Sequence, residues 1–235
     1  MKKIKVLVAT GSQDKFTRIS QWFENIENVE LLSFNDFPVS LVERAKVSDE
    51  EEKKFKTMRE RAIAKVQKPL KALGREFDGI VIATDDTAYF PLVDTEIVDL
   101  REPPDISSKG GEIVLAGVDK RLQGIDLANH YARLTDLAVK GKGSKYMPII
   151  WRFGLAAGRT NGSDNVEILA NWERKQYIQN TLLEETIEDT GYMMDYIISE
   201  TPKGETNSLR KKKWDEKEPK KALKQYLQAL AQDQD

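Results

Sequence analysis

The chain has 235 residues, and its 37 Lys and Arg residues nearly balance its 39 Asp and Glu residues. A chain of this length can bury a substantial core, and its balanced charge argues against a general nucleic-acid binder, which needs a basic surface to displace counterions. It has no cysteine and one histidine, His130, which excludes disulfides, thiolate chemistry, Ser-His-Asp triads and histidine-cluster metal sites. Any catalysis must therefore rest on carboxylates, lysines and hydroxyls. The balanced charge favours a small molecule as the partner.

The N-terminal sequence MKKIKVLVATG has an apolar stretch too short for a signal peptide. Farther along, no apolar run is long enough to span a bilayer. We therefore expect a soluble cytoplasmic protein whose partners include neither a membrane nor a nucleic-acid polymer.

The first segment is typical of a strand, a tight turn and a helix. Residues 4–8 are apolar and largely β-branched, and a helical pattern then begins at Phe16, Ile19, Trp22, Phe23 and Ile26. In the turn, Gly11 lets the backbone bend, Thr10 and Ser12 supply hydroxyls, and Lys15 adds positive charge near the free N–H groups of the helix. An anion would be held there. The turn lacks the GxGxxG and GxxxxGK[ST] patterns, however, and an ordinary N-cap beside a solvated lysine explains it equally well.

Residues 29–34 read as a second strand, and the resulting βαβ unit predicts a parallel pair in an α/β sheet. Apolar residues at three- and four-residue steps then predict a helix that begins near Ser48, where Ser48 and Glu51 match a capping box. Lys65 flanks the apolar stripe of this helix and can reach a neighbouring cleft. Pro69 is expected to kink or end the helix.

A central strand is predicted over residues 80–84, followed at once by the adjacent carboxylates Asp85 and Asp86. Two acids at the end of an apolar strand are costly to bury unless they face a cation or a cleft. In open α/β sheets, ligands bind at the carboxyl ends of the strands. The acid pair is therefore a candidate site, and an ordinary acidic turn is the alternative.

The second half of the chain begins with loop signals between Pro91 and Gly124. Further elements are predicted as a helix over residues 124–140, a hairpin of residues 147–157 and 165–170 around Thr160–Asn161–Gly162, a strand pair that includes residues 176–178 and 194–198, and a last helix with Pro219 in its first turn. His130 falls beside the apolar face of the first of these helices. We assign it a packing role and no catalytic role.

In this order, the motifs resemble the inosine triphosphatase-like family of nucleoside triphosphate pyrophosphatases. The family pattern T-G-N-x-x-K matches residues 10–15 apart from Ser12, E-N-A-x-x-K matches residues 60–65 apart from Arg61, and A-D-D-S-G is similar to residues 84–88. The resemblance implies an α/β fold with an elongated central mixed β-sheet flanked by helices and two lobes with a cleft between them. It implies a single domain over residues 1–235, with the second lobe roughly within residues 85–200, and a homodimer.

The resemblance also implies hydrolysis of a nucleoside triphosphate to the monophosphate and pyrophosphate, with Mg²⁺ as cofactor. Asp85 would bind the metal and orient or deprotonate the attacking water, and Asp86 would be the second carboxylate. A third metal-binding acid is expected just before the second helix. Glu43 aligns best by its distance to the capping box, and Glu51 and Glu52 are its rivals.

Lys15 and Lys65 would act with the acids as catalytic residues, because they neutralise the triphosphate. Tyr192, from a segment similar to the family pattern G-F-G-[YW]-D, would stack on the base. The full set of substrate-binding residues implied is Thr10, Gly11, Ser12, Lys15, Arg61, Lys65, Tyr192, Asp195 and Lys213.

The family's base-reading S-H-R is replaced here by Lys217-Glu218-Pro219. A carboxylate at Glu218 would repel a keto oxygen, and Pro219 has no side-chain donor, so selectivity for inosine or xanthosine triphosphate should be weaker or different. A basic residue from 210–213 filling the role is the alternative. Two functional classes stay open: a pyrophosphatase, with or without altered base specificity, and a nucleotide-binding regulatory relative without turnover.

Overall fold

Two compact units make up the chain in this computed structural model, which describes residues 3–74, 77–109, 112–117, 121–160, 166–184, 193–207 and 216–232. The first unit comprises Met1–Asp86, Phe153–Trp172 and Trp214–Asp235, and the second comprises Thr87–Arg152 and Glu173–Lys213. Three long strands contribute residues to both units: β3 (Gly79–Phe90), β7 (Tyr146–Arg159) and β8 (Val166–Gln179).

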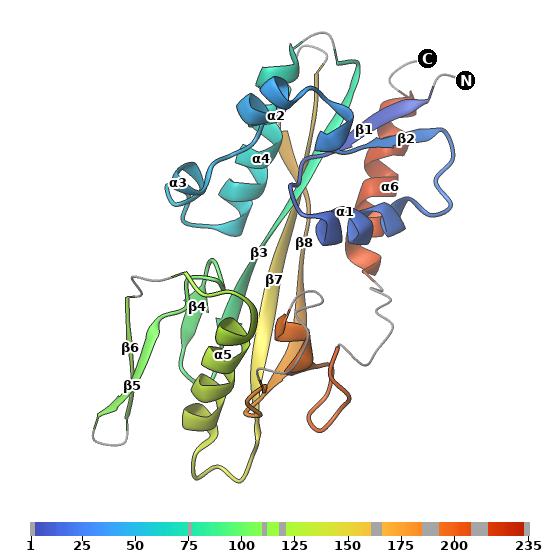
Figure 1. The fold of residues 1–235 in the computed structure, drawn as a ribbon. Helices are drawn as coiled ribbons and strands as arrows, with labels where there is room; N and C mark the ends of the chain where they lie inside the picture. Colours follow the sequence, from blue (N-terminus) through green and yellow to red (C-terminus); the bar gives the residue numbers. More distant parts are fainter. Residues whose placement is uncertain are drawn as a thin grey trace. The chain divides into compact units, whose positions relative to one another are not determined.

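The shorter elements each belong to one unit (Figure 1). In the first unit they are β1 (Ile4–Val8), α1 (Gln13–Ser20), the 3₁₀ helix η1 (Gln21–Phe23), β2 (Val29–Leu32), η2 (Phe34–Asp36), α2 (Val39–Ala45), α3 (Asp49–Glu52), α4 (Met58–Leu73) and α6 (Lys217–Gln232). In the second unit they are β4 (Thr95–Ile97), β5 (Asp105–Lys109), β6 (Glu112–Ala116), α5 (Gly124–Val139), η4 (Met193–Tyr196) and β9 (Ile198–Ser199).

The main sheet is mixed, with strand order β2-β1-β3-β7-β8-β9 and with β4 paired to β3. β1 lies parallel to both β2 and β3, which confirms the predicted βαβ unit. β4 and β9 are antiparallel to their partners, and Ile198 of β9 lies opposite Ile178 of β8. The predicted pair of residues 176–178 and 194–198 is therefore only partly correct, because residues 193–196 form the 3₁₀ helix η4. Residues 161–165, which include most of the predicted hairpin turn, lie outside the described residues.

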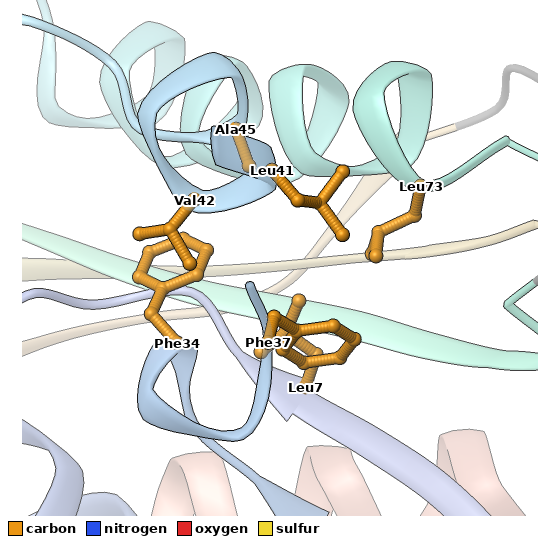
Figure 2. A pocket seen from close by; sticks show the side chains of 7 residues that line it. All are labelled: Leu7, Phe34, Phe37, Leu41, Val42, Ala45 and Leu73. Carbon is orange, nitrogen blue, oxygen red and sulfur yellow. The ribbon is translucent and has the colours of Figure 1, made fainter. Parts of the chain in front are cut away.

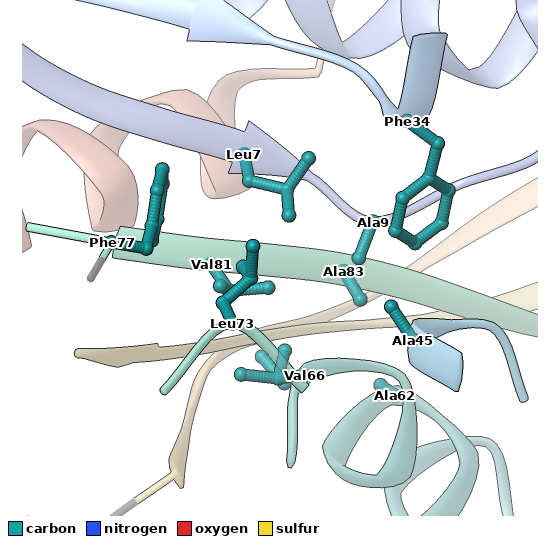
Figure 3. Packing of buried hydrophobic residues seen from close by; sticks show 11 residues of the cluster. Leu7, Ala9, Phe34, Ala45, Ala62, Val66, Leu73, Phe77, Val81 and Ala83 are labelled. Carbon is teal, nitrogen blue, oxygen red and sulfur yellow. The ribbon is translucent and has the colours of Figure 1, made fainter. Parts of the chain in front are cut away.

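The core of the first unit lies between the sheet and α4 (Figure 3). Leu7 of β1 and Val81 of β3 belong to the same buried cluster as Ala62 and Val66 of α4. The alternate strand residues are also buried: Val6, Val8, Ile80 and Ile82. Both faces of these parallel strands are therefore covered, which explains why their sequence is continuously apolar rather than alternating.

A small apolar pocket opens beside this core, lined by Leu7, Phe34, Phe37, Leu41, Val42, Ala45 and Leu73 (Figure 2). All of these side chains are apolar, and Phe37 also meets Phe77 edge-on, with the ring centroids 6.0 Å apart. A polar ligand would find no charged or hydrogen-bonding side chain among them. The pocket is therefore a packing feature between β1, η2, α2 and α4.

The predicted helix from Ser48 is two helices. Ser48 and Glu51 do form a capping box, but α3 ends at Glu52, and a second capping box of Thr57 and Glu60 starts α4 at Met58. The single continuous helix was therefore wrong, because two strong start signals lie nine residues apart, 48 to 57. Pro69 also fails to end α4, which continues to Leu73.

Three other predictions need correction. β3 does not end at the acid pair but continues through it to Phe90. The helix expected to extend to Ile26 ends as α1 and η1 at Phe23, with Asn25 at φ 70°. α2 and the β5–β6 hairpin were missed, the hairpin in a region read only as loop.

None of the helices in the described part of the chain combines the length and the apolar character needed to cross a membrane. α5 follows its prediction closely, ending one residue earlier than expected. His130 in α5 lies 3.0 Å from the Pro104 carbonyl oxygen and packs edge-on against Tyr131, and burial lowers the pKa of its imidazole. These contacts agree with a packing role.

We predict that Gly158→Ala destabilises the protein by about 1–3 kcal/mol, as overpacked cores do. A Cβ on Gly158 would lie 2.7 Å from Leu70 Cδ1 and 3.0 Å from Val66 Cγ1. Gly154→Ala on the same strand is the control, because its nearest neighbour is the flexible Met58 Sδ at 3.4 Å. Urea unfolding measures both variants, and equal stabilities would contradict the packing described for β7 and α4.

Candidate functional site

The turn after β1 is organised by its two hydroxyl side chains. Ser12 caps α1 by accepting a hydrogen bond at Oγ from the Lys15 backbone N–H at 3.3 Å, and its own N–H donates to Thr10 Oγ1 at 3.1 Å. Gly11 and Ser12 are exposed. The glycines with positive φ in the described residues are Gly74, Gly124, Gly141 and Gly143, so the bend expected of Gly11 does not depend on left-handed backbone.

Lys15 links this turn to the acid pair. Its ammonium Nζ lies 2.6 Å from Asp86 Oδ1, and the two side chains are 35% and 24% exposed. Burial alone would raise the pKa of Asp86, but the charge and hydrogen bond of Lys15 outweigh it and hold this pKa below 3.8. Asp86 is therefore ionised and reachable from solvent at neutral pH.

Lys65 holds the second acid. From α4, its Nζ lies 2.6 Å from Asp85 Oδ2 and 2.9 Å from Glu52 Oε1. Burial lowers the pKa of Lys65, but the two carboxylates outweigh that effect and raise it above 10.5. One ammonium thus joins the end of α3 to β3.

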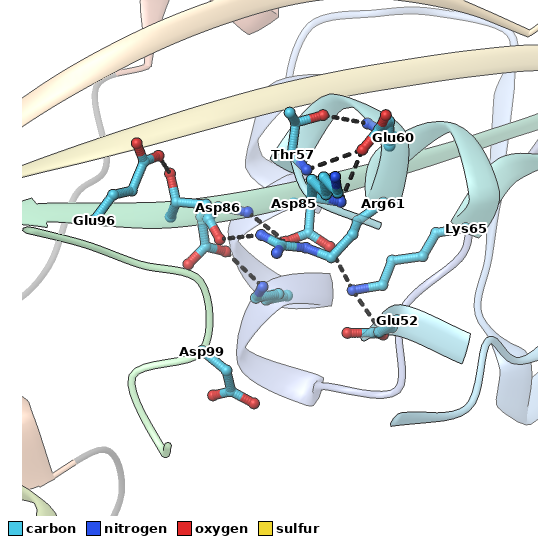
Figure 4. A network of polar contacts seen from close by, with 12 residues as sticks. Glu52, Thr57, Glu60, Arg61, Lys65, Asp85, Asp86, Glu96 and Asp99 are labelled. Atoms are coloured by element: carbon cyan, nitrogen blue, oxygen red, sulfur yellow. Dashed lines mark hydrogen bonds and ion pairs between the residues drawn. The ribbon is translucent and has the colours of Figure 1, made fainter. Parts of the chain in front are cut away.

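Arg61 completes the network from one turn earlier in α4 (Figure 4). Its Nη2 lies 3.1 Å from Asp85 Oδ1 and donates to the Asp86 carbonyl oxygen at 2.9 Å. The residue is only 2% exposed, and its Nη1 has no hydrogen-bond partner in the described residues. The resemblance implies that Arg61 binds substrate, and the structure buries this residue against the acid pair.

The two acids are held from different helices. Adjacent side chains of a strand point to opposite faces, and accordingly Asp85 is bound from α4 while Asp86 is bound from α1. Three cations, Lys15, Arg61 and Lys65, face three carboxylates in this ion-pair network, so their charges cancel. Asp85 is the more enclosed acid, with a side chain 7% exposed against 24% for Asp86.

Of the three rivals for the third acid, the structure brings Glu52 to the network, through Lys65. Glu43 is exposed on α2, and no contact joins it to the acid pair in the described residues. Glu51 instead binds Lys68 at 2.6 Å and caps α3, contacts that lower its pKa to about 2. Within the described residues no three acidic or histidine side chains form a ready-made metal cage.

The remaining predicted residues lie elsewhere. Asp195 belongs to the second unit, in η4, where Asn207 Nδ2 donates to its Oδ1 at 3.4 Å. Tyr192 and Lys213 lie outside the described residues. Glu218 is exposed in the first turn of α6, whereas Pro219 is buried.

The start of α6 is anchored by a residue that the sequence reasoning missed, Glu216. This carboxylate is 4% exposed and accepts hydrogen bonds from the indole N–H groups of Trp22 at 2.9 Å and Trp172 at 3.3 Å. Arg18 Nε lies 3.7 Å from the same carboxylate. A buried carboxylate with these partners fixes the start of α6 against α1, η1 and β8.

Solved structures of known proteins share this fold. A HAM1 protein from Coxiella burnetii matches with a TM-score of 0.57 at 12% identity, over 97% of this chain and 99% of that chain. A nucleoside-triphosphatase / dITP/XTP pyrophosphatase from Mycobacterium abscessus matches with a TM-score of 0.51 at 15% identity, over 97% of each chain. Neither a scan against family models nor a sequence search of curated proteins finds a match. The likeness confirms the predicted α/β fold with a mixed central sheet flanked by helices.

We predict that Arg61→Met lowers the free energy of unfolding by about 1–3 kcal/mol, because the buried Asp85 loses one cation and the Asp86 carbonyl loses its donor. Arg59→Met is the matched control, since Arg59 is exposed on the same helix. Denaturant unfolding of both variants measures the difference. Equal stabilities would show that Arg61 does not hold β3.

The depressed pKa of Asp86 predicts an acid-dependent contribution to stability. A carboxyl whose pKa is lower in the folded than in the unfolded state stabilises the fold above the unfolded value, here 3.8, and loses that effect as the pH falls through its folded pKa. The stability difference between wild type and Asp86→Asn should therefore be constant from about pH 7 to 5 and shrink toward about pH 3. Urea unfolding at each pH measures it, and a difference that does not change with pH would contradict the ion pair with Lys15.

Proposed function

We propose that this protein is a nucleoside triphosphate pyrophosphohydrolase that holds the triphosphate between the Thr10–Lys15 turn and the acid pair. The observation that carries the proposal is the convergence of Lys15, Arg61 and Lys65 on Asp85 and Asp86, beside an exposed turn with hydroxyl groups. The relative from Mycobacterium abscessus, whose fold is shared, is described as a dITP/XTP pyrophosphatase. The same reaction class is proposed for this chain.

The lysines suit an exchange of partners when a triphosphate arrives. Lys15 and Lys65 each end in a flexible ammonium that is partly exposed, at 35% and 21%, so each can turn from a carboxylate to a phosphate oxygen. Their departure would free the acids. Phosphoryl chemistry depends mainly on such positioning and charge neutralisation, which this arrangement provides without a nucleophilic side chain.

The donor set fits Mg²⁺ as the cofactor. Carboxylate oxygens are the hard ligands that this ion prefers, and it is usually held by one or two of them together with substrate phosphates and waters. Asp85 and Glu52 lie on one face of β3 and Asp86 on the other, so either face would supply one or two of these ligands. A preformed cage is therefore unnecessary. When bound, Mg²⁺ would screen the phosphate charges and polarise the phosphoryl group that is attacked.

Asp85 and Asp86 differ in solvent exposure, and we propose different roles for them. Asp86 is the more exposed carboxylate, and its proposed role is to orient the attacking water. It would accept the proton of that water after Lys15 has turned to a phosphate, because Lys15 lowers its pKa. Asp85 is enclosed by Arg61 and Lys65, and it serves chiefly to hold those cations and the strand in position. We therefore give Asp86 the role that the sequence assigned first to Asp85.

Glu218 is exposed in α6, and as a hydrogen-bond acceptor it would not select for a keto group on the base. The substrate class proposed is accordingly a purine or modified nucleoside triphosphate without strict selection for a keto group. A homodimer stays a prediction from the resemblance, and a cytoplasmic location stays a prediction from the sequence. A regulatory relative without turnover is the second candidate, favoured by the double pairing of Asp85, which leaves that acid without a free oxygen.

We expect pyrophosphate release from at least one nucleoside triphosphate in a panel of inosine, xanthosine, adenosine, guanosine and pyrimidine substrates, and only when Mg²⁺ is present. Asp86→Asn should lower kcat by about 10²–10³ and stay folded, because it removes charge without changing size. Asp85→Asn is the matched variant and should lose more stability than Asp86→Asn as well as activity, because Asp85 is paired with two cations and is more enclosed. Substrate binding without pyrophosphate release by wild type would favour the regulatory candidate, and release of orthophosphate alone would contradict the proposed reaction.

A further inference from the structure

We infer that Lys46 is an additional phosphate-binding residue, which contacts the triphosphate beside Gly11. The inference rests on the proposed function and adds a contact to the same site. None of the motifs in the sequence pointed to Lys46, because it lies thirty-five positions from Gly11, 11 to 46. The three-dimensional approach of α2 to the turn brings the two residues together.

The geometry places the Lys46 ammonium at the turn. A Cβ built on Gly11 would lie 3.7 Å from both Cε and Nζ of Lys46, and among the described residues beyond its chain neighbours no other atom comes as near. Lys46 is the C-cap of α2, where its N–H donates to the Val42 carbonyl oxygen. Ala45 beside it is 2% exposed, so the base of the side chain is fixed while its end is in solvent.

Lys46 differs from the other cations of the site because no carboxylate among the described residues pairs with it. Its Nζ instead lies over the Phe34 ring, 5.6 Å from the ring centroid. Lys15 and Lys65 are both ion-paired with acids. Since the three-cation, three-acid network is neutral, Lys46 supplies uncompensated positive charge at the turn, which an incoming polyanion would meet first.

The exposed backbone of Gly11 also indicates a phosphate contact at this turn. Its backbone does not require glycine, because its φ is outside the left-handed region, yet the residue is exposed directly beneath an ammonium group. A missing side chain there leaves room for a phosphate oxygen between the Gly11 backbone and Lys46 Nζ. Alanine at this position would meet Lys46 at ordinary van der Waals distance, so it should fold normally while filling that room.

The test compares Lys46→Met with Lys71→Met, which removes the same charge from an exposed residue at the end of α4. Inorganic tripolyphosphate is titrated calorimetrically into each folded protein, at low and at high salt. We expect Lys46→Met to weaken tripolyphosphate binding about tenfold or more, and its salt dependence to be smaller, because a hydrogen bond to a charged group is lost. Lys71→Met should bind as the wild type does.

With a hydrolysed nucleotide, Lys46→Met should raise KM far more than it lowers kcat. Gly11→Ala should also weaken tripolyphosphate binding, and it should add little in the Lys46→Met background, because both changes disturb one contact. If Lys46 only stabilises the fold through Phe34, Lys46→Met should change the free energy of unfolding but bind tripolyphosphate as tightly as Lys71→Met does. That result would overturn the inference.

The outcomes separate the two proposals. If the wild type hydrolyses nucleotides but Lys46→Met and Lys71→Met bind tripolyphosphate equally well, only the role of Lys46 is overturned. Wild type that binds tripolyphosphate through Lys46 without releasing pyrophosphate from any nucleotide would overturn the proposed reaction and keep the binding residue. Wild type that binds no tripolyphosphate would overturn both.

Discussion

The ion pairing of two adjacent carboxylates inside a long strand is the constraint on which the rest of the first unit depends. An aspartate in the interior of a sheet is costly to bury unless cations compensate it. Here α1 sends Lys15 to Asp86, and α4 sends Arg61 and Lys65 to Asp85. Because each helix must reach its acid, the pairing fixes where both helices lie along β3.

The same pairing explains why the end of β3 could not be predicted. From the sequence, an apolar run followed by two acids is typical of a strand that ends in solvent, and nothing nearby in the chain offers a counter-charge. The cations come from positions 15, 61 and 65, which are adjacent to the acids only in the folded protein. Local patterns did predict what depends on local interactions, namely the parallel β1–β2 pair, the Ser48 capping box and α5.

The residues of the candidate site also divide into those that short sequence patterns predict and those that depend on contacts between distant elements. Lys15, Lys65, Asp85 and Asp86 could be chosen from the sequence because each lies in a short pattern that resembles a motif of the pyrophosphatase family. Glu52 was only one of three rivals, since a chain distance does not say which acid faces Lys65. The burial of Arg61 and the approach of Lys46 to Gly11 needed the structure, because each is a contact between elements far apart in the sequence.

The start of α6 and the acid pair of β3 differ in how strongly the fold restricts their side chains. Glu216, with the indoles of Trp22 and Trp172, fixes the start of this helix through buried hydrogen bonds. Two residues later Glu218 is exposed, so its identity is not restricted by packing. A buried anchor therefore holds α6 in place whatever side chain follows at 218. The acid pair has no such freedom, because replacing either carboxylate would leave cations unpaired. Charge compensation thus restricts Asp85 and Asp86, whereas a substitution at the exposed Glu218 would cost the fold little.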